Sequence, residues 1–141
     1  GIENSNIKLI IEVKDDLKLN TYKNEFQQVI LNIINNAKEH LVQKEIQDAY
    51  IKLYSVKKNG VISLLIEDNG GGIEVETKKK IFEPYFTTKH EIDGTGIGLY
   101  MSKIIIDKNM KGKLKVRNTK DQHKKSWTVG LSNLCHQTSS S

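Results

Sequence analysis

Two glycine-rich segments hold the residues of this chain that could do chemistry. An acid precedes glycines at residues 68–73 (Asp-Asn-Gly-Gly-Gly-Ile), and glycines alternate with other residues at 94–99 (Gly-Thr-Gly-Ile-Gly-Leu). Glycine lacks a Cβ, so its backbone N–H can closely approach a phosphate, and the apolar run after Leu99 predicts a helix whose N-terminus favours one. Asp68, at the end of an apolar strand, could read a base. Each segment alone is ordinary turn or loop chemistry, but in this order the two predict a nucleotide site.

Two asparagines predict a place for a metal ion beside that site. Asn32 and Asn36 are four residues apart in a segment with helical apolar spacing, so they share a helix face that borders the apolar stripe near Val29. Amide oxygens there could complete the shell of a Mg²⁺ ion that bridges phosphates. The alternative is a pair of boundary asparagines with no ligand. Asparagine is a poor helix former, so a cluster of Asn32, Asn35 and Asn36 in one helix requires an explanation.

A loop between the two glycine segments could cover a bound nucleotide. Phe82 and Phe86 flank Glu-Pro-Tyr, and Thr87, Thr88 and Lys89 follow. One interpretation is that the rings simply pack in the core. The functional interpretation adds that they anchor a mobile loop, in which Lys89 brings positive charge near a phosphate.

The apolar spacing predicts an α+β protein with two layers. Strands are expected over 7–13, 50–56, 61–67, 113–118 and 127–131, and helices over 24–42, 76–81 and 97–108. Asn59-Gly60 predicts the turn of a hairpin between the second and third strands. The order favours a two-layer α/β sandwich with a mixed, mostly antiparallel sheet. A doubly wound dinucleotide fold is disfavoured, because its glycine fingerprint would follow the first strand.

Composition predicts one soluble globular domain. The 141 residues carry a formal net charge of +5 and are 37% hydrophobic, which is enough for a real core. We expect residues 1–134 to form this domain and the serine-rich residues 135–141 to form a flexible tail. No stretch suits a membrane span, and the single cysteine, Cys135, needs no oxidising compartment, so a cytoplasmic location is expected. Lysines without interleaved aromatics indicate a solvated surface and not a nucleic-acid partner.

Four motifs in one order resemble boxes of the sensor histidine kinases. Residues 32–37 (Asn-Ile-Ile-Asn-Asn-Ala), 68–73, 81–89 (Ile-Phe-Glu-Pro-Tyr-Phe-Thr-Thr-Lys) and 94–99 are similar to the N, G1, F and G2 boxes of that family. The likeness extends over about residues 7–131, and four boxes in order are a strong signal. The resemblance implies the Bergerat fold, an α/β sandwich shared with gyrase-type, Hsp90-type and MutL-type ATPases. It also implies ATP and Mg²⁺ as ligands.

The resemblance implies a role for each matching residue. Asp68 would accept a hydrogen bond from the adenine amino group, and Asn36 would bind Mg²⁺ with help from Asn32 at the phosphates; these two asparagines would be the catalytic residues. Residues 87–93 would form a lid over ATP. The implied nucleotide-binding residues are Asn32, Asn36, Asp68, Gly70, Gly72, Ile73, Phe86, Thr87, Lys89, Gly94, Thr95, Gly96, Ile97, Gly98 and Leu99.

The amide at position 32 favours a histidine kinase over related enzymes. In the ATP-hydrolysing members and the anti-sigma serine kinases, a Glu usually stands four residues before the Mg²⁺-binding Asn and activates water or a hydroxyl. Asn32 is no base, which spares ATP for transfer to an imidazole, a good nucleophile when neutral. The implied reaction moves the γ-phosphate of ATP to a histidine on a separate helical domain, with a response regulator downstream. The alternative is an ATPase or serine kinase of the same superfamily, with Glu39 as its candidate base.

The chain departs from the family pattern at a few positions. Glu39 stands where many members have a basic residue. Lys124-Lys125 replaces the terminal Gly-Thr, so an adenine-side hydroxyl is either missing or supplied by Ser126. We expect surface or boundary positions, and no phosphoacceptor or metal-ligand role, for the four histidines, which are His40, His90, His123 and His136. The phosphoacceptor is therefore expected outside this chain.

Overall fold

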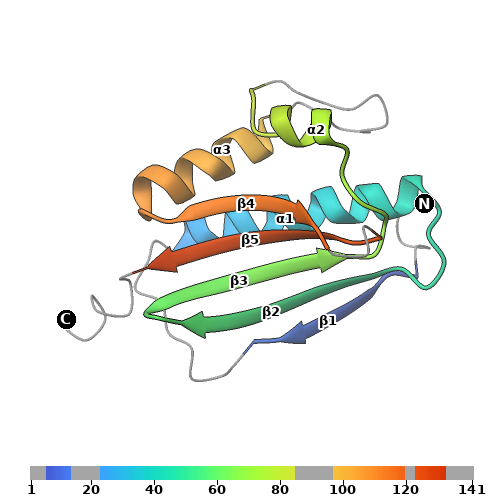
Figure 1. The fold of residues 1–141 in the computed structure, drawn as a ribbon, viewed down its shortest axis with the longest axis horizontal. Coiled ribbons are helices and arrows are strands. Elements are labelled where there is room, and N and C mark those ends of the chain that lie inside the picture. Colours follow the sequence, from blue (N-terminus) through green and yellow to red (C-terminus); the bar gives the residue numbers. More distant parts are fainter. Residues whose placement is uncertain (1–5, 14–22, 85–96, 120–122, 133–141) are drawn as a thin grey trace.

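The chain folds into two layers, a five-stranded sheet and a layer of helices (Figure 1). This computed structural model describes residues 6–13, 23–84, 97–119 and 123–132. The expectations for the tail at 135–141 lie outside these residues, as do those for Phe86, Thr87, Lys89, Gly94, Thr95 and Gly96.

The sheet is mixed and mostly antiparallel, as the sequence predicts. Its strands are β1 (Lys8–Glu12), β2 (Tyr50–Lys58), β3 (Val61–Asp68), β4 (Lys113–Asn118) and β5 (Lys125–Ser132). Their order across the sheet is β1-β2-β3-β5-β4. β1 runs parallel to β2, and the other neighbouring strands run antiparallel. The central strand is β3, whose nearly continuous apolar run is typical of an inner strand.

The helices of the described residues are α1 (Lys23–Gln43), α2 (Val75–Lys80) and α3 (Gly98–Ile104). α1 packs against β2 and β3 and also contacts α3 (Figure 1). The sequence predicts one helix over 97–108, whereas the structure changes from α3 to a π-helical turn, η2 (Ile105–Asn109). None of the described helices has both the length and the hydrophobicity needed to cross a membrane.

The core lies between α1 and the sheet because each presents apolar side chains at its own period. α1 buries Val29, Ile33, Ala37 and Leu41, which recur every four residues. The facing strand residues are Ile62, Leu64 and Ile66 in β3, and Trp127, Val129 and Leu131 in β5. Burying each large apolar side chain contributes about 1.5–3 kcal/mol. The same alternation brings the last residue of β3, Asp68, and the first of β5, Lys125, to the side of the sheet that faces α1.

The ends of two strands have different causes. β2 and β3 are joined by Asn59 and Gly60, which have φ angles of 53° and 78°, as the predicted Asn-Gly turn requires. β5 begins at Lys125 and not at Trp127, where the apolar pattern begins. Pairing of Lys125 with Asp68 on one side and with Asn118 on the other extends the strand. This long-range pairing, and not the local pattern, sets where β5 begins.

Candidate functional site

Three polar residues form a row across the end of the sheet. Asp68 of β3 pairs with Lys125 of β5, and Lys125 pairs in turn with Asn118 of β4. Residues paired across strands present their side chains on the same face. Because Asp68 follows Ile66 at the two-residue strand period, this row continues the apolar face toward α1. A core that is otherwise apolar therefore ends in a polar edge beneath the helix.

Asp68 is a fully buried carboxylate with one unused acceptor atom. Its exposed fraction is 0%, and its Oδ1 accepts a hydrogen bond from the Gly70 N–H at 3.0 Å. Its Oδ2 lies 3.7 Å from Lys125 Nζ and accepts no hydrogen bond from the described residues. Burial raises the pKa of Asp68, while the Lys125 ammonium and the Gly70 N–H act to lower it. A buried oxygen without a donor is suited to a ligand that brings one.

Lys125 is one site residue that sequence reasoning missed. Its side chain is only 4% exposed, and its Nζ donates a hydrogen bond to Asn36 Oδ1 at 3.3 Å. The ammonium also lies 5.7 Å from the centroid of the Trp127 ring. The signal was present in the alternation, because Lys125 stands two residues before Trp127 and so shares its inward face. Of the two alternatives for the adenine-side hydroxyl, a missing one or one from Ser126, the second is not favoured, because Ser126 pairs with Glu67 and lies on the other face of the sheet.

The two asparagines of α1 have different partners. Asn36 and Asp68 both lie next to the Lys125 ammonium, and the amide oxygen of Asn36 accepts a hydrogen bond from it. Asn32 donates from Nδ2 to the Gly98 carbonyl at 3.2 Å and to Ser102 Oγ at 3.0 Å. Its Oδ1 accepts from Gln28 Nε2 at 2.9 Å. Asn32 therefore connects α1 to the beginning of α3. This contact between helices explains why a residue that forms helices poorly stands at this position of α1.

The turn after β3 is held against α1. The Gly70 carbonyl accepts a hydrogen bond from His40 Nε2 at 2.8 Å, and a Cβ on Gly70 would lie 2.6 Å from His40 Cδ2. Only glycine fits so close an approach. Burial, and then the charge of Lys125, lower the pKa of His40 to about 4, so its ring is neutral at pH 7 and donates from Nε2. His40 is a half-buried boundary residue.

The remaining predicted base-side residues line the same turn. Gly72 is half-buried, and Ile73 is 9% exposed. The Asn118 side chain accepts from the Ile73 N–H and donates to the Ile73 carbonyl, at 2.6 and 3.0 Å. Asn118 therefore fixes the turn to the edge strand. It was not among the predicted site residues, because its partners lie 45 residues away.

The phosphate side is described only from Ile97 onward. Gly98 is the first residue of α3, Ile97 immediately precedes it, and Leu99 packs against the core. The three described atoms nearest to a Cβ on Gly98 would belong to Asn32, at 3.6 Å or more, which is ordinary contact. The structure thus brings Asn32 and Gly98 together, and it brings Asn36 and Asp68 to a shared partner, Lys125. Glu39 is half-buried on the same helix.

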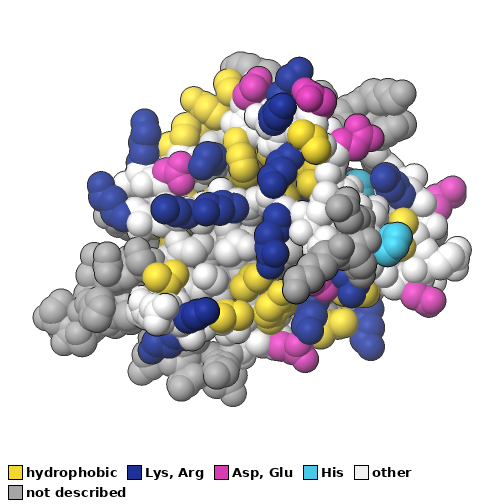
Figure 2. All heavy atoms as spheres, viewed as in Figure 1, with side chains coloured by type: hydrophobic (Ala, Val, Ile, Leu, Met, Phe, Trp, Pro, Cys, Tyr) yellow, Lys and Arg dark blue, Asp and Glu magenta, His cyan; other side chains and the backbone are white. Residues whose placement is uncertain are grey.

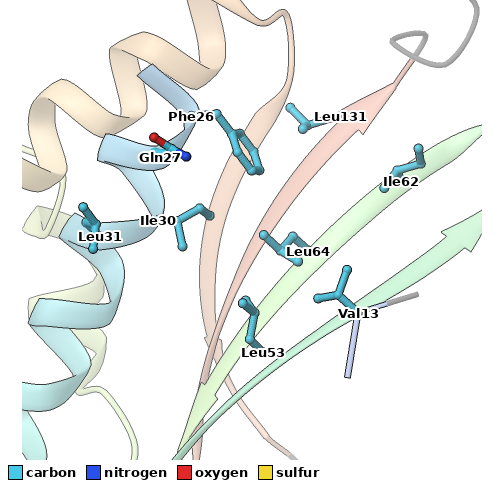
Figure 3. Close-up of a pocket in the computed structure, with 9 residues that line it drawn as sticks. All are labelled: Val13, Phe26, Gln27, Ile30, Leu31, Leu53, Ile62, Leu64 and Leu131. Atoms are coloured by element: carbon cyan, nitrogen blue, oxygen red, sulfur yellow. The ribbon is translucent and has the colours of Figure 1, made fainter. Parts of the chain in front are cut away.

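The described surface has two other features, an apolar pocket and a row of basic side chains. An open pocket of about 530 Å³ lies between α1 and the sheet, toward the beginning of β3 (Figure 3). Its lining residues are Val13, Phe26, Gln27, Ile30, Leu31, Leu53, Ile62, Leu64 and Leu131. All but Gln27 are apolar, so this lining offers no charge to a phosphate.

Lys and Arg side chains follow β4 in Figure 2. Lys113, Lys115 and Arg117 are exposed there, and β4 is an edge strand. Charged side chains on an edge strand commonly protect it against pairing with another chain.

Comparison with known proteins identifies the family. Residues 21–132 match the family described as "Histidine kinase-, DNA gyrase B-, and HSP90-like ATPase". Two-component sensor PprA from Pseudomonas aeruginosa is 39% identical over 97 residues, which is 67% of this chain and 10% of that protein. Signal transduction histidine-protein kinase AtoS from Escherichia coli is 36% identical over 102 residues, which is 72% of this chain and 16% of that protein. The chain therefore spans only a small part of these relatives' length.

Solved structures share the fold. The catalytic domain of histidine kinase ThkA, in a nucleotide-free form, superposes with a TM-score of 0.74 at 26% identity, covering 90% of this chain and 79% of that one. ThkA in complex with response regulator protein TrrA gives a TM-score of 0.72 at 25% identity, over 90% of this chain and 34% of that one. The chain therefore belongs to the family of histidine kinase-, DNA gyrase B- and HSP90-like ATPases, and it is an ATP-binding catalytic domain of the sensor histidine kinase type.

Proposed function

We propose that this domain holds ATP with Mg²⁺ and transfers the γ-phosphate to a histidine on a separate helical domain of its parent sensor kinase. The observation that carries the proposal is the unused buried oxygen of Asp68, which lies beside the α1 face that bears Asn36. A purine amino group is a donor of the size and polarity that this oxygen requires. We assign the base to Asp68, Gly70, Gly72 and Ile73.

We assign the phosphates to the Asn32 end of the α1 face that carries both asparagines. Gly98 begins α3, and the backbone N–H groups at a helix beginning favour phosphate oxygens. The assignment extends to Ile97 and Leu99, and to the expected residues of the loop, which are Phe86, Thr87, Lys89, Gly94, Thr95 and Gly96. The tie between Asn32 and the Gly98 carbonyl supports a fixed distance between α1 and this helix beginning.

The donor set suits a Mg²⁺ ion that is held mainly by phosphate. Among the described residues, no three carboxylates, histidines or cysteines converge on one point. Mg²⁺ in nucleotide sites typically takes one or two protein oxygens and fills its shell with phosphate oxygens and water. Asn36 Oδ1 already faces a cationic group, the Lys125 ammonium. We therefore assign Mg²⁺ to Asn36, with Asn32 beside it, and the bound ion would neutralise charge on the phosphates.

The proposed reaction relies on positioning and charge neutralisation. Asn32 has no proton to gain at neutral pH, and its amide is engaged with Gln28, Gly98 and Ser102. It therefore leaves water unactivated. A neutral imidazole needs no base to attack phosphorus, so bringing it in line with the γ-phosphate is sufficient. ATP is the small-molecule partner, and we place the domain in the cytoplasm, where ATP is supplied.

The protein partners follow from the proposed transfer. The donor domain must meet a helical domain that carries the acceptor histidine, and the phosphoryl group then passes to a response regulator. A related kinase, ThkA, has been solved with response regulator TrrA, and this supports the second step. The proposal includes neither a nucleic acid nor a membrane segment within this chain.

A phosphotransfer assay tests the proposal. The 141-residue chain is mixed with γ-labelled ATP, Mg²⁺ and a helical hairpin that carries the acceptor histidine of the parent kinase. We expect label on that histidine, strong loss of transfer in Asn36→Ala and little change in Asn35→Ala, a matched variant at an exposed position of α1. Efficient release of inorganic phosphate without the hairpin would instead support the ATPase alternative, with Glu39 as the residue to examine.

A further inference from the structure

The base end of the site holds a hydrogen-bond donor beside an acceptor. Asp68 and Lys125 are cross-strand partners, both on the face toward α1, and their side chains are 0% and 4% exposed. A buried ammonium requires an ionised partner, since an uncompensated charge inside a protein is strongly unfavourable. Lys125 Nζ is 3.7 Å from Asp68 Oδ2 and 3.3 Å from Asn36 Oδ1. The ammonium is therefore part of the surface that any base at Asp68 would meet.

The two groups have opposite requirements. An ionised carboxylate only accepts hydrogen bonds, and an ammonium only donates them. The edge of adenine presents a donor, the 6-amino group, next to an acceptor, N1. The edge of guanine presents an acceptor, O6, next to a donor, the N1–H. Asp68 alone would take the adenine amino group and repel O6, whereas a carboxylate with an adjacent ammonium can satisfy either edge.

We propose that Lys125 reads the base together with Asp68, and that the pair admits guanine as well as adenine nucleotides. This inference rests on the proposed function, which assigns the base to Asp68. Lys125 donates to N1 of adenine while Asp68 accepts from the amino group. Guanine has its donor and acceptor in the reverse order, so it binds in a shifted orientation, in which Lys125 donates to O6 while Asp68 accepts from N1–H.

The opposing interpretation is that the Lys125 side chain only blocks the site. Its side chain then fills space that the base must occupy, and its removal would improve the binding of every purine equally. The two interpretations differ in the ratio of guanine to adenine affinity and not in affinity itself. That ratio is insensitive to how tightly the variant packs, because both nucleotides meet the same protein.

Calorimetric titration with MgADP and MgGDP tests the inference on the 141-residue chain. We expect the unaltered chain to bind GDP within about tenfold of ADP, and Lys125→Met to weaken GDP relative to ADP by about tenfold or more, the effect of one hydrogen bond with a charged donor. Lys124→Met is the matched control, because Lys124 is the neighbouring lysine and its Nζ lies over the Tyr50 ring. The control should leave the ratio unchanged.

A second measurement needs no variant and so does not depend on folding. An ADP analogue in which a C–H replaces N1 should bind the unaltered chain about tenfold more weakly than ADP, because the donor from Lys125 then meets no acceptor. Rejection of GDP by more than about a hundredfold, an unchanged ratio in Lys125→Met, or equal binding of the analogue would each overturn the inference while ADP still binds. Failure to bind ADP at all would instead overturn the proposed function, and this inference with it.

Discussion

Substitution of Asp68 by asparagine should separate the stability of the domain from its affinity for nucleotide. Asparagine keeps an oxygen to accept from the Gly70 N–H, which Asp68 Oδ1 does at 3.0 Å. It can place an amino group where Oδ2 lies 3.7 Å from Lys125 Nζ. Two donors then face each other, and a buried ammonium loses its counter-charge.

The structure sets the size of the effect. Removing one partner of a buried ion pair typically costs about 3–5 kcal/mol. Both side chains are almost completely buried, at 0% and 4% exposed, so solvent screens the charges little. Lys125 keeps its hydrogen bond to Asn36, which favours the lower limit, and we expect Asp68→Asn to lower the free energy of unfolding by about 3 kcal/mol. Loss of a charged acceptor should also weaken ADP binding by about 1.5–3 kcal/mol.

Urea unfolding followed by circular dichroism gives the stability of Asp68→Asn, Lys125→Met and the double variant. The double variant removes both charges, so it should be more stable than the sum of the single effects predicts, by at least about 1 kcal/mol. Calorimetry should show that the double variant does not regain ADP affinity. Additive destabilisation, or a loss below about 1 kcal/mol in Asp68→Asn, would refute the ion pair as the origin of the effect.

Three further variants test other contacts of the site. Asn32→Ala removes the tie between α1 and α3 and should lower the free energy of unfolding in urea by about 1–2 kcal/mol. Gly70→Ala, with its Cβ 2.6 Å from His40 Cδ2, should cost about 1–3 kcal/mol in the same assay. Because the pKa of His40 falls from 6.5 to about 4 on folding, only the unfolded chain binds this proton between those values. Stability should therefore fall as pH drops through that window, by about 1–2 kcal/mol after allowance for partial exposure. His40→Gln, which keeps a donor but does not titrate, should flatten that dependence.

Each of these expectations has a contrary result. Equal stability of Asn32→Ala and Asn35→Ala would mean that the tie contributes nothing, since Asn35 is exposed. A stable Gly70→Ala would mean that the turn can move away from α1. A pH dependence in His40→Gln equal to that of the unaltered chain would assign the acid sensitivity to other groups; Lys125 and Lys44 are the charges that act on this ring.

Local patterns predict most of the fold. The spacing of Val29, Ile33 and Ala37 predicts α1 because a helix buries one stripe, and Asn59-Gly60 predicts the hairpin because this turn needs positive φ. β4 begins and ends where the alternation of Leu114 and Val116 places it. In each case the signal lies within one element and needs no knowledge of its neighbours.

Contacts between distant segments explain what the sequence did not reveal. Lys125 carries a charge and precedes the apolar run of β5, so nothing local indicates that Asp68, 57 residues earlier in the numbering, draws it into the sheet. Asn32 was expected at the phosphates, and its bonds to Gly98 and Ser102 depend on how α3 packs against α1. Gly70 was expected to let a base approach, and the group that approaches it in the described structure is His40. The assignments of these residues to the nucleotide remain proposals.

One buried side chain serves as an intrinsic fluorescent probe of the domain. Trp127 is the sole tryptophan of the sequence. Its side chain is fully buried, and its ring meets Phe82 edge to face at 5.9 Å. Since the Lys125 ammonium lies 5.7 Å from the same ring, a ligand that displaces this charge changes the electric field at the indole. Intrinsic fluorescence should therefore report occupancy near Lys125 without any attached dye.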